Sequence, residues 1–248
     1  MLRLFSSIRH SLLAGNNTVK YLKYAVGEVL LIMVGIILAL QFNNWNEGRK
    51  EEQERQELIE NLKLDFEISL ERLETEIKEA EENYKNIELL LRNSGGEPSD
   101  LTVEEIRRLH GRIMSSNAYT PAFGAYQSAM STGVITSLGS RELNSLFIEF
   151  ERRNVRLDEL EDLYGNLEFS GTFQELRSQL GSSRILRVVG GFVPEKFQVN
   201  EQEFRELVAR PDVYAIFDTR RHIKSRQLNN FGALKGIIEQ ILAELEAL

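Results

Sequence analysis

The sequence has no cysteine, only three histidines and a single tryptophan among its 248 residues. Without cysteine the chain can form no disulfide and no thiolate-ligated metal site. This absence fits either side of a membrane, so it does not decide the compartment. None of the histidines has a second histidine or cysteine three or four residues away, which excludes the usual zinc spacing. They are His10, His110 and His222.

The motifs that mark common enzyme classes are also missing. The chain contains no G-x-S-x-G nucleophile elbow, no Walker A loop and no dinucleotide-binding fingerprint. The glycine pair Gly190-Gly191 lacks the strand–turn–helix context and the lysine that a phosphate-binding loop needs. We therefore expect that the protein is not an enzyme and needs no cofactor.

One long hydrophobic run, Tyr24–Phe42, dominates the N-terminal part of the chain. A helix rises about 1.5 Å per residue, so about 20 residues cross a hydrocarbon core of about 30 Å. A buried core helix and a cleaved signal peptide are the alternatives. The run ends without the small residues of a cleavage site and begins late for a secretion signal. We therefore predict an uncleaved transmembrane helix over residues 21–45.

Aromatic and basic residues flank this run as they do at membrane interfaces. The expected interface anchors are Lys20, Tyr21, Lys23, Tyr24 and Trp45. Residues 1–23 hold four basic side chains and no acid, whereas the opposite flank has mixed charge. The positive-inside rule then places the N-terminus in the cytoplasm and the long C-terminal part outside it.

A single acid, Glu28, lies inside the run. It shares one helix face with Gly35, Ala39 and Phe42, at offsets of 7, 11 and 14 residues. Small residues let a second helix approach closely, and a polar residue can bond across such a contact. The face is therefore a candidate oligomer interface or a ring of carboxyls lining a pore. The alternative is an acid that only reaches back to the cytoplasmic edge.

The chain beyond the run is patterned as an all-α protein. Residues 46–92 are rich in helix formers and place apolar or small residues at heptad steps with one stutter at Leu73–Ile77. Similar seams recur from Leu143 to Leu167 and from Phe231 to Leu248. These patterns predict a transmembrane helix that continues into a long helix, and an antiparallel helical bundle over residues 93–248 that packs on it.

More local signals divide the bundle. Thr102 and Glu105 form a capping box, and Ser140 is placed to cap the second long helix. A short helix is expected from Ala122 to Ser131, with Phe123, Tyr126 and Met130 on one side. We expect residues 49–92 to run antiparallel to the helix that starts at Ser140. A short extended piece is expected at 185–189, and a new helix at Asn200.

The charge of the chain is unevenly spread. Its net charge is −8, and residues 47–92 contribute 15 acids and 8 bases. Nucleic-acid binding by the main domain is therefore not expected. One dense basic run interrupts the acidic domain, and its members are Arg220, Arg221, His222, Lys224 and Arg226. This cluster could meet lipid headgroups, a phosphate or sulfate ligand, or the acidic face of the first long helix.

The segment before the span has its own pattern. Residues 2–13 place apolar side chains at helical spacing beside two arginines. This is typical of a helix that lies on a membrane surface, and a frayed tail is the alternative. We assign residues 1–20 as a cytoplasmic amphipathic segment.

The run Lys23–Glu47 resembles the N-terminal signature of an uncharacterised single-span membrane protein family found widely in Bacteroidota. The matching positions are Gly27, Glu28, Gly35, Ile36, Ala39, Leu40, Gln41, Asn43, Trp45 and Asn46. Phe42 stands where that family usually has a β-branched residue. The segments Ser131–Gly133 and Arg141–Leu143 also resemble its second motif. The resemblance implies an inner-membrane protein with a periplasmic helical domain, and it brings no activity or catalytic residue.

Two functions remain open from the sequence. The first is a single-pass, self-associating membrane protein whose periplasmic bundle senses, scaffolds or binds a protein partner. The second is a homo-oligomeric cation channel or ion-coupled unit in which Glu28 lines the pore. Both require membrane lipid and several copies of the chain.

Overall fold

The computed structural model describes residues 18–94, 101–102, 105, 108–109, 113, 119–168, 171 and 201–248. These residues are helical wherever they are regular, so the predicted all-α class is confirmed. The chain divides into two compact units, Met1–Glu57 and Leu58–Leu248. The predicted segments 2–13 and 185–189 lie outside the described residues.

Helix α2, Thr18–Asn93, belongs to both units. It is followed by α4 (Gly124–Thr132), the 3-10 helix η1 (Val134–Leu138) and α5 (Arg141–Glu168). Helices α8 (Glu201–Val208) and α9 (Pro211–Glu246) complete the described chain. Proline at the first position of α9 suits a helix start, because the N–H that it lacks would have no partner there.

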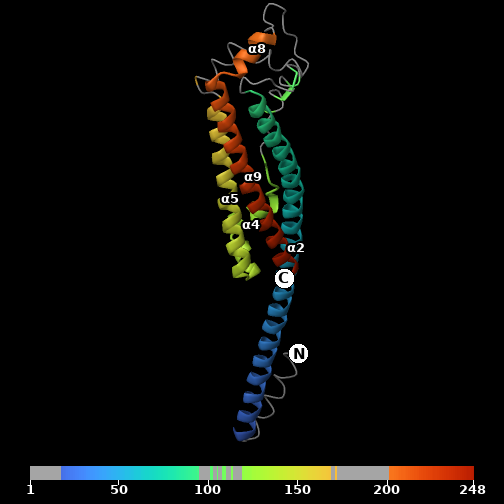
Figure 1. Cartoon of the computed structure of the whole chain (residues 1–248). Helices are drawn as coiled ribbons and strands as arrows, with labels where there is room; N and C mark the ends of the chain where they lie inside the picture. Colours follow the sequence, from blue (N-terminus) through green and yellow to red (C-terminus); the bar gives the residue numbers. More distant parts are fainter. Residues whose placement is uncertain are drawn as a thin grey trace, which may run out of the picture. The chain divides into compact units, whose positions relative to one another are not determined.

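The second unit is a bundle of α2, α5 and α9 (Figure 1). Its core contains most of the residues that the three heptad seams predict. Ile77, at the stutter, is only partly buried. Burying this apolar surface stabilises the bundle by about 25 cal/mol for each Å² removed from water. The fully or almost fully buried seam residues include Leu62, Phe66, Leu73, Leu143, Phe150, Leu157, Phe231, Leu234, Ile238, Ile241 and Leu245.

The direction of α5 differs from the prediction. The ring of Phe66 lies 5.8 Å from that of Phe147, and farther along both helices Glu76 interacts with Glu161. Contacts farther along α2 are therefore made by residues farther along α5, so the two helices are parallel. The predicted antiparallel pairing of residues 49–92 with α5 is wrong. Helix α9 is the antiparallel partner, since Ser140 bonds Glu244 whereas Tyr164 bonds Arg220.

A return segment, residues 119–123, explains this parallel arrangement. It brings the chain back along α2 before α4 and α5 begin, and three side chains of α2 hold it. Ser69 Oγ accepts a hydrogen bond from the Ala122 N–H at 2.8 Å, and Arg72 Nη1 donates to the Thr120 carbonyl at 3.1 Å. The third is Asp65, which lies one turn before Ser69.

Asp65 supplies the N-terminal cap that α4 lacks in its own sequence. Phe123 occupies the cap position and makes no side-chain hydrogen bond. The Asp65 carboxylate instead accepts from the N–H groups of Ala125 at 2.7 Å and Tyr126 at 3.0 Å. A carboxylate at a helix N-terminus satisfies free donors and matches the positive end of the dipole.

Several local predictions can be compared with the described residues. The Thr102 N–H donates to Glu105 and the Glu105 N–H donates to Thr102, so the capping box is confirmed. Ser140 Oγ accepts from the Leu143 N–H, as predicted. In α4 the buried residues are Tyr126 and Ala129, and Met130 is exposed.

We predict that Asp65→Ala lowers the free energy of unfolding by about 1 kcal/mol, because it leaves two N–H groups of α4 without their acceptor. Asp65→Asn, which keeps an acceptor oxygen, should lose less. Urea unfolding of the full-length protein in mild detergent measures both. Glu67→Ala, at an exposed position two residues away, is the control. Equal losses for Asp65→Ala and Glu67→Ala would contradict the capping role.

Candidate functional site

The first unit carries the apolar part of α2. Among the described residues, one helix is long and apolar enough to cross a membrane, and no part of its most apolar 18-residue window is buried. Large side chains such as Leu31, Met33 and Leu38 are more than half exposed. Exposed apolar surface on this scale marks a lipid or protein contact. The single membrane-spanning segment predicted from the sequence matches this helix.

The predicted membrane face lies along one stripe of α2, because its members follow helical spacing within a single helix. Glu28 is partly exposed, and Ala39 and Phe42 are exposed. A methyl group added at Gly35 would meet no atom within 4 Å. The stripe is therefore open to a second helix at Gly35, Ala39 and Phe42.

Near the end of this stripe the aromatic rings of Phe42 and Trp45 lie 5.9 Å apart, and the Arg49 guanidinium stands 5.6 Å from the Trp45 ring. Of the predicted interface anchors, Lys23 and Trp45 are exposed. The side chains of Lys20, Tyr21 and Tyr24 lie outside the described residues. An arginine beside tryptophan is a contact suited to the wet end of a membrane helix.

In the second unit the predicted basic cluster is divided between the interior and the surface. Arg220 and Lys224 are buried, with exposures of 0% and 4%. Arg221 and His222 lie outward beside Asp218, and Arg226 is exposed. The five residues therefore do not form one patch. Instead they contribute to a buried polar cluster and, separately, to the outer surface.

Arg220 is held at the centre of the buried polar cluster, which comprises Glu76, Glu161, Tyr164, Arg220, Lys224 and Gln227. Its Nη1 donates to the Tyr164 hydroxyl at 3.0 Å and to the Ile113 carbonyl at 3.2 Å. Its guanidinium carbon lies 4.6 Å from the centre of the Tyr164 ring. The tyrosine hydroxyl in turn donates to the Ile113 carbonyl at 2.9 Å. Hydrogen bonds and the aromatic face thus offset part of the cost of burying the charge.

Lys224 lies one turn further along α9. Its Nζ donates to Gln227 Oε1 at 2.7 Å and lies 5.5 Å from the Tyr164 ring. Burial lowers the pKa of Lys224, and the Arg220 charge adds to this, whereas Glu76 and Glu161 oppose it. Both carboxyls have a raised pKa, chiefly because they are partly buried. The cluster therefore joins charges from all three helices in a weakly solvated place.

A groove of about 490 Å³ lies beside this cluster, between α2 and the return segment. Glu76 and Tyr119 contribute to its lining, together with Ile68, Glu71, Arg72, Thr75 and Thr120. Burial raises the pKa of Tyr119, whose hydroxyl donates to the Ser69 carbonyl. Among the described residues, no three potential ligands lie together in a way that could hold a metal ion. What the cluster offers is three titratable groups, Glu76, Glu161 and Lys224, whose charges act on one another.

The heptad pattern of α9 predicts this buried cluster, although the run of adjacent basic residues obscures the pattern. The seam of α9 continues upstream from Phe231 through positions 227, 224, 220 and 217 at steps of four, three, four and three. Three of these four seam positions are polar, and all four side chains are buried. Extending the heptad would have placed Arg220 and Lys224 inside and left Arg221, His222 and Arg226 outside.

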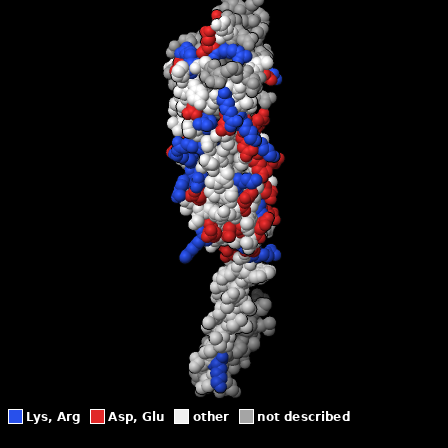
Figure 2. Space-filling model, viewed as in Figure 1, with Lys and Arg blue, Asp and Glu red and all other residues white. Residues whose placement is uncertain are grey.

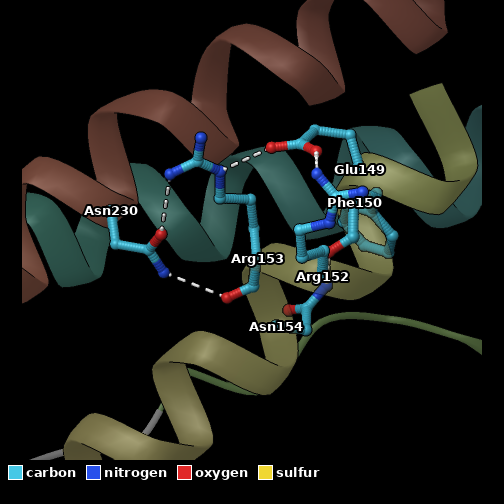
Figure 3. Close-up of polar contacts among 6 residues, drawn as sticks. All are labelled: Glu149, Phe150, Arg152, Arg153, Asn154 and Asn230. Carbon is cyan, nitrogen blue, oxygen red and sulfur yellow. Dashed lines mark hydrogen bonds and ion pairs between the residues drawn. The ribbon is translucent and has the colours of Figure 1, made fainter. Parts of the chain in front are cut away.

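A second polar contact joins α5 to α9 (Figure 3). Arg153, the charged interruption in the α5 seam, donates from Nη1 to Asn230 Oδ1 at 3.3 Å, and its Nε donates to Glu149 at 2.9 Å. Asn230 Nδ2 donates back to the Arg153 carbonyl at 3.0 Å. This two-way contact fixes the register between the helices.

We predict that Glu161→Gln makes the protein relatively more stable as the pH rises from 4 to 7. The folded state holds the Glu161 proton more tightly than the unfolded state, so this residue contributes stability below its ordinary pKa of 4.5 that is lost as the pH rises through its raised value. The substitution removes that loss. Thermal unfolding of the full-length protein in detergent at three pH values measures it.

Asp162→Asn, at the exposed neighbouring position, is the matched control for this experiment. It should leave the pH dependence as it is in the unmodified protein. The same pH profile for both variants would show that Glu161 does not titrate abnormally.

The comparisons with known proteins give one match. A family model described as a family of unknown function (DUF6090) matches residues 28–180, which is more than half of the chain. No curated protein and no solved structure matches the chain. The matched region starts at Glu28, inside the apolar part of α2, and continues through the return segment and α5. The chain therefore belongs to the DUF6090 family, a family of unknown function.

Proposed function

We propose that this protein is a single-pass, self-associating inner-membrane protein that presents a periplasmic helical bundle for sensing, scaffolding or binding a protein partner. The observation that carries the proposal is the uncovered apolar surface of α2 between residues 25 and 42. Such a surface needs lipid or other apolar helices around it. The stripe of Glu28, Gly35, Ala39 and Phe42 offers a place for a second copy.

The orientation is supported by charge. Residues 1–23 contain four basic side chains, Arg3, Arg9, Lys20 and Lys23, and no acid. Cytoplasmic flanks of membrane helices carry such an excess of Lys and Arg. The bundle is then periplasmic, as the resemblance to a Bacteroidota membrane family also implies.

The bundle suits a binding or relay module. Its three helices are bonded to one another by specific polar contacts: Lys235 to Glu74, Arg153 to Asn230, and Arg220 to Tyr164. These contacts set which residues face each other, so the surface of the bundle has a defined shape. A defined surface on a membrane anchor is what a scaffold or a sensor requires.

We predict that oxidation in intact membranes cross-links the variants Gly35→Cys and Ala39→Cys. The variants Met33→Cys and Ile37→Cys, on the other side of the helix, should cross-link much less. The chain has no cysteine of its own, so each variant reports one position. Non-reducing gel electrophoresis measures the fraction of linked species, and Gly35→Leu should weaken association because it blocks close approach.

Cross-linking that is equal on both sides of the helix would contradict a specific interface. A strictly monomeric species in mild detergent and in membranes would remove the self-association proposal. The size of the linked species also separates the two candidate functions. A dimer favours a scaffold, because two helices cannot enclose a water-filled path, and a ring of five or more favours a pore.

A second candidate function, a cation channel or ion-coupled unit, follows from Glu28. It is the one acid between Tyr24 and Phe42, and acids inside membrane helices often mark ion pathways. We predict for this candidate that Glu28→Gln abolishes cation conductance in liposomes while the assembly stays intact. Absence of conductance from the unmodified protein would exclude it.

A further inference from the structure

A second groove lies between α5 and α9. On the face of the bundle seen in Figure 2, acidic side chains gather mostly along the α2 edge. It has a volume of about 280 Å³. Three arginines, two asparagines and one leucine line it: Arg153, Arg156, Leu160, Arg226, Asn229 and Asn230. None of these lining residues is acidic, although acids outnumber bases by eight in the chain.

The three arginines differ in how they are held. Arg153 is fixed by Glu149 and Asn230, and Arg156 pairs with Glu159 at 2.6 Å. Arg226 is exposed and forms no ion pair or hydrogen bond with another part of the described chain. The groove is therefore lined by two arginines of α5 that are paired with acids and by Arg226 of α9, which has no counter-charge among the described residues. An anion in the groove would supply the counter-charge for Arg226.

The lining also has the right chemistry for an oxyanion. Guanidinium groups donate in a planar fork that matches phosphate oxygens, and asparagine amides add neutral donors. The volume is just below the range of about 300–1,000 Å³ that holds drug-sized ligands, which favours a small ligand. Because Arg153 is already oriented by two partners, it can donate its remaining N–H groups with little reordering.

We propose that this groove, between Arg153 and Arg156 on α5 and Arg226 on α9, is a binding site for a small phosphate-bearing anion. The site is separate from the membrane face and does not depend on self-association. Its phosphate can come from a soluble compound or from a lipid headgroup, since the recognised group is the same. Binding would link α5 to α9 and tighten that side of the bundle.

The test is isothermal titration of pyrophosphate into the full-length protein in nanodiscs of phosphatidylcholine. We expect saturable binding that weakens by about tenfold or more in Arg226→Gln and in Arg156→Gln, since each loses charge-assisted hydrogen bonds to the anion. Arg152→Gln is the matched control, because Arg152 is an exposed arginine on the same helix that does not line the groove. It should bind like the unmodified protein.

No saturable binding, or equal loss in Arg152→Gln and Arg226→Gln, would overturn the proposal. Unchanged thermal unfolding of Arg226→Gln verifies that a loss of binding is not a loss of fold. A second titration in nanodiscs containing phosphatidylglycerol identifies the source. If phosphatidylglycerol weakens pyrophosphate binding to the unmodified protein but not to Arg226→Gln, the groove binds a lipid headgroup. If it weakens binding equally in both proteins, the ligand is a soluble phosphate compound.

Discussion

The bundle depends on how helix α2 holds the segment that returns along it. A chain that leaves α2 at Asn93 must come back before a parallel helix can pack beside it, and this return exposes backbone groups that need partners. Asp65, Ser69 and Arg72 provide them from one side of α2. Because these contacts start α4 at the level of Asp65, α5 begins near the first turns of α2 in the bundle, and α9 closes the core in the opposite direction.

The part of this core around Arg220 and Lys224 is unusual because it buries cations instead of apolar side chains. Removing a guanidinium and an ammonium from water is costly, and partners seldom recover all of that cost. The lost hydration of the two cations is partly replaced by contacts with Tyr164, the Ile113 carbonyl and Gln227. Glu76 and Glu161 supply opposite charge. Such a cluster fixes which residues meet across the helices. The cluster also makes the stability of this part of the core more sensitive to pH than that of the aromatic part around Phe66.

Much of the helical framework could be predicted from the sequence, because heptad steps and capping residues act locally. The capping box at Thr102, the cap at Ser140 and the seam from Phe231 to Leu245 depend on neighbours in the chain. The direction of α5 could not be predicted this way, since it is set by Asp65 bonding atoms about sixty residues away. The basic run misled for a related reason: its residues are adjacent in sequence, whereas a helix sends Arg220 and Arg221 to different environments. The groove at Arg226 likewise needs α5 and α9 side by side.

The parallel course of α2 and α5 with α9 returning has a mechanical consequence. Because α9 runs antiparallel to α2, Leu58 and Leu248 lie at the same end of the bundle, and both pack against its core. Tension applied between these two points would peel α2 from α9 one turn at a time. Tension between Leu58 and the start of α9 at Pro211 would instead load every contact of the core in shear, which resists far larger forces.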